Sequence, residues 1–133
     1  MKDICQHQCL IDTGMVSKMK LIEVKNILNA TVFTNQSDEF LASAEVNQAC
    51  GADLMSDVLA YVKDKGLLLT GLMNLQVIRT AEMMDINAIC FVRGKKPSQD
   101  LLDLANDTNL VLMGTDCPLY VSCGKLYKNG LIC

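Results

Sequence analysis

The fold is decided by the segment LLLTGLMNLQVIRTAEMMDINAICFVRGKKPSQDLLDLANDTNLVLM, residues 67–113. It contains three short runs, 67–70, 88–92 and 110–113, that are apolar at nearly every position. Strands that are apolar on both faces are typical of a parallel sheet covered by helices. The stretches between the runs carry apolar residues at helical spacing. The segment therefore predicts alternating strands and helices joined by right-handed crossovers.

Working outward, we expect a three-layer, Rossmann-like α/β domain with a mainly parallel sheet. The expected helices span 21–28, 54–62, 75–84 and 98–105, with a closing helix from Pro118, and a further strand spans 31–34. Ser98 is expected to cap its helix. Residues 35–39 are expected to form a polar turn. Residues 40–50 alternate in polarity, which favours a strand with one wet face, although the alanines weaken that interpretation.

Length and composition allow one domain of this kind. The chain has 133 residues, of which 50% are hydrophobic and 20% charged, and this excludes a disordered acidic segment. The net charge of −3 argues against a general nucleic-acid binder. The longest apolar runs reach five residues, as in 88–92, whereas a membrane-spanning helix needs about 20. We therefore expect neither nucleic acid nor a membrane as a partner.

The seven cysteines suggest a compartment and one metal hypothesis. The first twenty residues lack the apolar core of a secretory signal, so reduced thiols in the cytoplasm are expected. Cys5, His7 and Cys9 are the candidate metal ligands, but structural zinc takes four ligands. Residues 1–18 are therefore interpreted as an N-terminal arm without fixed structure, and residues 19–133 as the domain.

Function is expected in the loops that follow the strands. In parallel sheets ligands bind beyond the carboxyl ends of the strands, and the loops 70–74, 93–98 and 114–118 each contain a glycine. The candidate ligand-binding residues are Thr70, Gly71, Asn74, Arg93, Gly94, Lys95, Thr115, Asp116, Ser56 and Asp57.

Each candidate group has a plainer alternative. The cations of 93–96 beside a helix N-terminus could hold a phosphate, or they could form a solvated basic turn. Asp116 could orient a ligand hydroxyl or cap a helix. Asp53 and Asp57, four residues apart, could bind a cation or act as acid and base; we interpret them instead as helix-start charges.

Catalytic signatures are missing from the sequence. It has no phosphate-binding G-x-x-x-x-G-K-[ST], no dinucleotide-binding G-x-G-x-x-G and no G-x-S-x-G nucleophile elbow. Its single histidine, His7, falls in the expected arm, which leaves no base for a serine or cysteine nucleophile. We therefore expect no catalytic residues, no cofactor and no enzyme.

Several phrases resemble the DRTGG domain family over about residues 20–131. They are DLMSDVLA (53–60), LLT (68–70), NAICFV (87–92), RGKKP (93–97) and VLMGTD (111–116). That family is similar to the N-terminal domain of HPr kinase/phosphorylase and to a regulatory domain of large phosphotransacetylases. The resemblance implies an α/β fold of that type and a regulatory role. Gly71, Gly94, the 53–57 phrase and Thr115-Asp116 match its motif positions.

The departures from the family pattern lie in two of the loops. Gly71-Leu72-Met73 stands where many members have Gly-Asp-Arg, and Val92-Arg93-Gly94 stands where Thr-Gly-Gly is common. The missing Asp-Arg pair puts the family's charged loop chemistry in doubt.

The leading hypothesis is a non-enzymatic regulatory domain that senses a small anionic or nucleotide-like ligand and forms a homodimer. The apolar content and a mean hydropathy of +0.24 motivate self-association. Two alternatives remain: a phosphotransfer enzyme, by the family's association with serine kinases, and a cysteine-rich redox or metal adaptor. The resemblance also implies a protein partner in a signalling or redox system.

Overall fold

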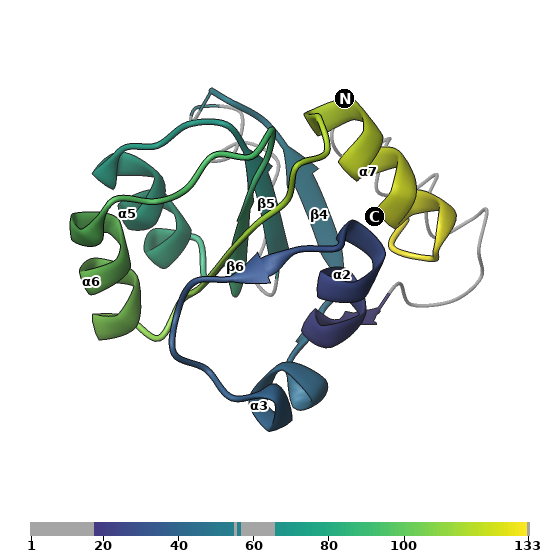
Figure 1. Ribbon diagram of the computed structural model, residues 1–133, viewed down its shortest axis with the longest axis horizontal. Coiled ribbons are helices and arrows are strands. Elements are labelled where there is room, and N and C mark those ends of the chain that lie inside the picture. The colour runs from purple at the N-terminus through teal and green to yellow at the C-terminus, as the bar shows by residue number, and fades with distance from the viewer. Residues whose placement is uncertain (1–17, 55, 57–65, 133) are drawn as a thin grey trace.

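The computed structural model describes residues 18–54, 56 and 66–132. Within them, five strands form one sheet in the order β2-β7-β6-β5-β4 (Figure 1). The strands are β2 (Thr31–Val32), β4 (Gln48–Gly51), β5 (Gly66–Thr70), β6 (Ala88–Phe91) and β7 (Val111–Gly114). Strands β4 to β7 run parallel, whereas β2 pairs antiparallel with β7. The predicted mainly parallel α/β sheet is confirmed.

Helices cover both faces of this sheet. Helices α2 (Leu21–Leu28) and α7 (Leu119–Lys128) lie on one side, and α5 (Leu75–Met83) and α6 (Gln99–Asp107) lie on the other (Figure 1). A short helix α3 (Asp38–Ser43) and a separate antiparallel pair, β1 (Met19–Lys20) with β3 (Glu45–Val46), extend the α2 side. The domain therefore has three layers.

Alternation along the strands explains why the runs are apolar throughout. Leu67 and Leu69 pack into the core on the α2 and α7 side, whereas Leu68 packs into the core on the α5 and α6 side. All three leucines are fully buried. A strand between two layers of helices needs apolar side chains at both parities, because neither face reaches water.

Side-chain caps fix where two of the helices begin. The Asn74 side chain accepts a hydrogen bond from the Val77 amide at 3.3 Å, at the start of α5. Ser98 accepts one from the Leu101 amide at 3.4 Å at the start of α6, as predicted. Each cap satisfies a backbone donor that the first helical turn leaves free.

The strand predicted over 40–50 is wrong in its first half. Residues 38–43 form α3, which Ser37 caps by accepting from the Phe40 amide at 3.1 Å. Two acidic residues in the first turn favour the same helix. The predicted strand depended on alternating alanines at 42 and 44. Burying such small side chains stabilises a strand only weakly, so the capped helix is favoured instead. Strand structure begins only with β3 and β4.

One further predicted strand is shorter than expected, and two other predicted segments fall mostly outside the described residues. The strand expected over 31–34 is regular only over 31–32, although the Phe33 amide still bonds the Leu112 carbonyl at 2.8 Å. Most of the expected arm and of the helix expected over 54–62 lies outside the described residues. No helix among those described is long and apolar enough to cross a bilayer.

The contact between β4 and α7 yields a stability prediction. A Cβ at Gly51 would lie 2.6 Å from Cys123 Sγ and 3.1 Å from Leu119 Cδ1. Gly51→Ala is therefore expected to lower the free energy of unfolding by about 1–3 kcal/mol through overpacking. The matched control is Gly124→Ala in α7, where a Cβ meets no atom within 4 Å. It is expected to add about 0.5–1 kcal/mol by helix propensity. Urea denaturation measures both, and equal effects would contradict this packing.

Candidate functional site

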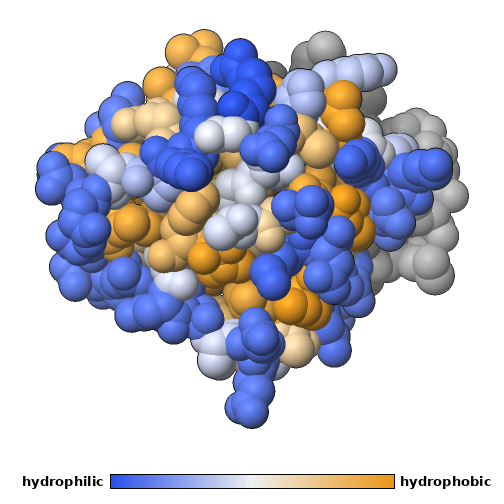
Figure 2. All heavy atoms as spheres, in the orientation of Figure 1, coloured by the Kyte–Doolittle hydropathy of each residue, from blue (hydrophilic) through white to orange (hydrophobic). Residues whose placement is uncertain are grey.

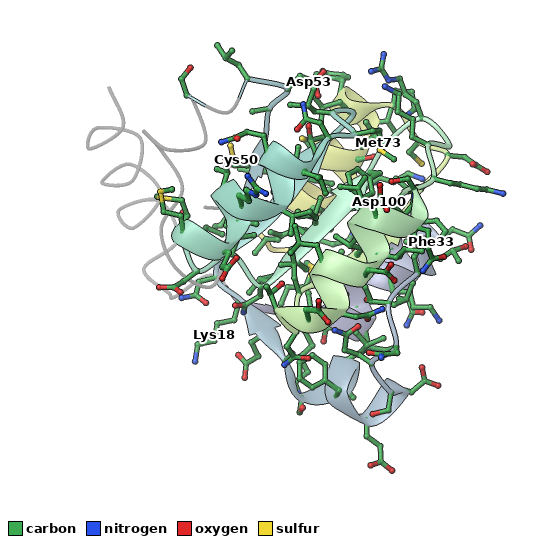
Figure 3. The ribbon with its side chains drawn as sticks, turned by 90° about the vertical axis from the view of Figure 1, so that its left-hand side faces the viewer. Lys18, Phe33, Cys50, Asp53, Met73 and Asp100 are labelled. Carbon is green, nitrogen blue, oxygen red and sulfur yellow. The ribbon has the colours of Figure 1, made fainter. Side chains whose placement is uncertain are left out.

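The loops that follow β5, β6 and β7 meet at one edge of the sheet. Backbone pairing continues into them: the Val92 amide bonds the Thr70 carbonyl at 3.1 Å, and the Thr115 amide bonds the Phe91 carbonyl at 2.9 Å. Figure 3 shows Asp53, which follows β4, at the same end of the molecule as Met73, and Lys18 at the opposite end. The edge thus gathers loops that are distant in the sequence.

Asp53 organises the first of these loops. Its Oδ1 atom accepts hydrogen bonds from the Gly71 amide at 2.8 Å and from Thr70 Oγ1 at 3.0 Å. Thr70 Oγ1 accepts in turn from the Leu72 amide at 3.1 Å. One carboxylate oxygen therefore fixes the chain where it leaves β5.

These contacts hold Asp53 in its ionised form. The hydrogen bond from the Gly71 amide is the largest influence that lowers the pKa of this carboxyl. Partial burial works in the opposite direction, while the Thr70 hydroxyl and the charges of Arg93 and Lys95 lower the pKa further. A carboxylate is favoured because its oxygens accept hydrogen bonds and lie near cations.

Two cations approach Gly71 from the second loop. Lys95 Nζ donates to the Gly71 carbonyl oxygen at 2.7 Å. A Cβ on Gly71 would lie 2.7 Å from Arg93 Nη2, so the guanidinium group lies against the bare Cα of this glycine. Both cationic residues are exposed to solvent. A glycine at this position therefore admits charged groups that a larger residue would displace.

The second loop turns sharply after β6. Arg93 and Gly94 have φ values of 59° and 71°, and the Lys95 amide closes the turn on the Val92 carbonyl at 3.4 Å. A left-handed conformation is uncommon for arginine. Here the Arg93 amide bonds the Cys117 carbonyl at 3.0 Å and the Gly94 amide bonds that of Thr115 at 2.9 Å. The third loop thus holds the second in this conformation.

The third loop is partly structural. Thr115 is buried, and its hydroxyl donates to the Leu28 carbonyl at 2.7 Å and accepts from the Cys117 amide at 3.3 Å. Asp116 is exposed, and its Oδ1 atom lies 3.2 Å from where a Cβ on Gly94 would be. Asp116 is therefore the carboxylate of this loop that faces the Arg93–Gly94 turn.

The predicted candidates separate into groups. Thr70, Gly71, Arg93 and Lys95 lie together around Asp53, and Gly94 and Asp116 lie beside them. Asn74 and Thr115 use their side chains for a cap and for a link to α2. Ser56 is exposed. Asp57, Cys5, His7 and Cys9 lie outside the described residues.

Asp53 is the functional candidate that the sequence interpretation missed. Interpreted as a helix-start charge, it instead bonds the Gly71 amide from a bend that follows β4. The available signal was its place just after a strand that ends at the same edge as β5. In the described part of the chain, no three His, Cys, Asp or Glu side chains are grouped to hold a metal ion.

Comparison with known proteins reveals a likeness of fold. No family model matches this chain, and no curated protein matches it in sequence. It is similar to a crystal structure of the CBS and DRTGG domains of the regulatory region of Clostridium perfringens pyrophosphatase, complexed with the activator diadenosine tetraphosphate. The TM-score is 0.68 and the identity 11%, over 98% of this chain. The match spans 51% of that chain, so this protein corresponds to about half of the neighbour's length.

The lowered pKa of Asp53 predicts an effect on acid stability. A carboxyl whose pKa is lower in the folded state contributes stability above its unfolded pKa, about 3.9, and loses it as the pH falls through the folded value. Asp53→Asn is therefore expected to lower the urea midpoint at neutral pH and to reduce its further fall near pH 3. The control is Asp107→Asn, at the exposed end of α6. Identical midpoint-against-pH curves for wild type and Asp53→Asn would contradict the role of Asp53.

Proposed function

We propose that this chain is a non-enzymatic regulatory domain of the DRTGG type that senses a phosphate-bearing, nucleotide-like ligand at the edge built around Gly71. The observation that carries the proposal is the convergence of Arg93, Lys95 and Asp53 on Gly71: Lys95 bonds its carbonyl, Asp53 bonds its amide, and the Arg93 guanidinium lies against its Cα. Charged groups of this kind commonly bind ligands, and here they lie on loops that are exposed at the ends of the strands.

The charges at this edge suit an anion. The Arg93 guanidinium presents donors in a planar fork that matches phosphate oxygens, and Lys95 adds an ammonium group. Helices α5 and α6 begin just after the loops that follow β5 and β6. Their N-termini, the positive ends of the helix dipoles, therefore point toward the carboxyl ends of the strands, where these loops lie. A phosphate group would therefore meet cations and helix N-termini together.

The carboxylates favour a ligand that carries more than phosphate. Asp53 sits beside the cations and repels an anion that offers no hydrogen-bond donor. Asp116, beside the Arg93–Gly94 turn, supplies a second acceptor. A molecule with both phosphate oxygens and hydroxyl donors, such as a nucleotide, satisfies both kinds of group.

The fold likeness supports a regulatory role over a catalytic one. The similar structure is the regulatory region of a pyrophosphatase, and its activator is a dinucleoside polyphosphate. The resemblance noted in the sequence leads independently to the same class of domain. The cytoplasmic location expected from the reduced thiols is part of this proposal.

The test is a thermal-shift and calorimetric series with phosphate, acetyl phosphate, AMP, ATP and diadenosine tetraphosphate. A ligand at 100 times its dissociation constant is expected to add about 2.7 kcal/mol to the unfolding free energy. Arg93→Gln and Lys95→Gln are expected to weaken its binding at least tenfold, since each removes a charge-assisted contact of about 1.5–3 kcal/mol. Lys128→Gln, at the exposed end of α7, is the matched control and should leave binding unchanged. Equal binding by all four proteins, or by none with any compound, would refute the proposal.

Self-association through α7 is a further part of the proposal. Tyr120 and Tyr127 are 89% and 62% exposed and lie seven residues apart, on one face of the helix. Large exposed aromatic side chains are enriched in interfaces. The wild type is expected to sediment as a dimer at micromolar concentration, and Tyr120→Glu with Tyr127→Glu as a monomer. A wild type that sediments only at 14.6 kDa would contradict this part.

A further inference from the structure

A separate cavity lies beside β2, the outermost strand of the sheet on the side away from β4. Its volume is about 430 Å³, which is in the range of small-molecule sites. The cavity is bounded by the end of α2, by β2, by the loop that follows β2 and by α3; its lining residues are Lys25, Ala30, Thr31, Val32, Thr34, Gln36, Asp38 and Leu41. Figure 1 shows this loop in blue, arching to α3 from the blue strand arrow, β2, which overlaps the label of β6 in this view. None of these residues belongs to the site around Gly71.

The Gln36 side chain lines this cavity, and its amide group makes no hydrogen bond to the described residues. Its Nε2 and Oε1 atoms are both buried and have no hydrogen-bond partner among the described residues. Buried polar atoms in folded proteins nearly always have a partner, because an unpaired donor or acceptor loses its hydration for nothing in return. The amide is therefore available to pair with a molecule that enters the cavity, whether water or a ligand.

Hydrogen bonds fix the chain on both sides of Gln36, so the backbone from which its side chain extends is held in place. The Thr34 hydroxyl accepts from the Leu112 amide at 3.1 Å, and the Asn35 amide donates to the Asn106 side chain at 3.3 Å. On the other side, Ser37 accepts from the Phe40 and Leu41 amides through its hydroxyl and carbonyl oxygens at 3.1 Å. A backbone that is already ordered reduces the entropy lost when a ligand binds.

We propose that this cavity binds a planar, uncharged group with a hydrogen-bond donor next to an acceptor, as in a primary carboxamide or a nucleobase. Such an edge pairs with both atoms of the Gln36 amide at once, the geometry by which glutamine recognises adenine in other settings. The side chains of Ala30 and Leu41 are buried and apolar, which suits the body of a flat ring. Figure 2 shows apolar side chains among polar ones on this face.

The charges at the cavity argue against an ionic ligand. Lys25 and Asp38 both line it and have opposite signs, so neither an anion nor a cation gains from the pair as a whole. A neutral ligand avoids that conflict. This site would therefore differ in chemistry from the phosphate-binding edge, and its ligand need not be the same molecule.

The experiment uses the full chain labelled with ¹⁵N and follows the side-chain amide resonances of Gln36. Four compounds are titrated one at a time: nicotinamide and, for adenine, 9-methyladenine, each with a matched control that lacks the donor, methyl nicotinate and 9-methylpurine respectively. Nicotinamide or 9-methyladenine is expected to shift the Gln36 resonances in a saturable way, and the controls at least tenfold more weakly. Binding of 9-methyladenine but not nicotinamide would identify a nucleobase as the source of the edge, and the reverse a carboxamide.

Two variants separate binding from folding. Gln36→Met keeps the length of the side chain but removes the unpaired amide; it is expected to weaken binding at least tenfold and to raise the urea midpoint without ligand. The control, Gln99→Met, removes an exposed amide that donates to Asp103 at 2.8 Å, and should change neither quantity in this direction. Gln36 resonances that no probe shifts, or Gln36→Met binding as tightly as wild type, would overturn the proposal. Its failure leaves the phosphate-binding tests unaffected, because those use other residues.

Discussion

The candidate site depends on the register in which β5, β6 and β7 pair. Thr70 lies opposite Phe91, and Phe91 lies opposite Gly114, so the last residues of the three strands are level. Level ends place Gly71 and Arg93 in neighbouring loops at one height. A shift of one residue would turn every side chain to the other face, so Leu67, Leu68 and Leu69 would each leave the core that they fill. Core packing on both faces therefore fixes the register, and the register fixes which loop residues meet.

Glycines at this edge let groups approach that a side chain would keep apart. A Cβ on Gly114 would lie 2.7 Å from the ring of Phe33, so the bare Cα lets the loop that follows β2 pack against the end of β7. Gly71 gives the same freedom to Arg93. Close approach of backbone and neighbouring group is one of the recurrent uses of glycine. Here Gly114 lets the segment after β2 pack at the end of β7, and Gly71 lets Arg93 of the next loop pack at the end of β5.

The features that could be predicted from the sequence are those with a strong periodic signal. The runs at 67–70 and 88–92 indicated buried parallel strands because full burial leaves no polar position, and a cap at Ser98 follows from local chemistry. Helix α3 was missed because a six-residue helix is too short for its period to compete with an apparent alternation. The role of Asp53 could not be read locally, since its partner amide lies 18 residues away. Contacts between residues of different strands depend on the strand register, and the register is difficult to predict from a single sequence.

That last point bears on the Asp-Arg pair missing from the loop after β5. Where the family resemblance places Gly-Asp-Arg in one loop, this chain has Gly71-Leu72-Met73, which suggested a site without its charges. In three dimensions an aspartate and an arginine still lie at Gly71, but Asp53 comes from the loop after β4 and Arg93 from the loop after β6. Because the strand order places β5 between β4 and β6, both neighbours of the glycine loop can supply a charge. The aspartate and the arginine at Gly71 are thus supplied by the two loops that flank it in space, and not by the loop that contains it.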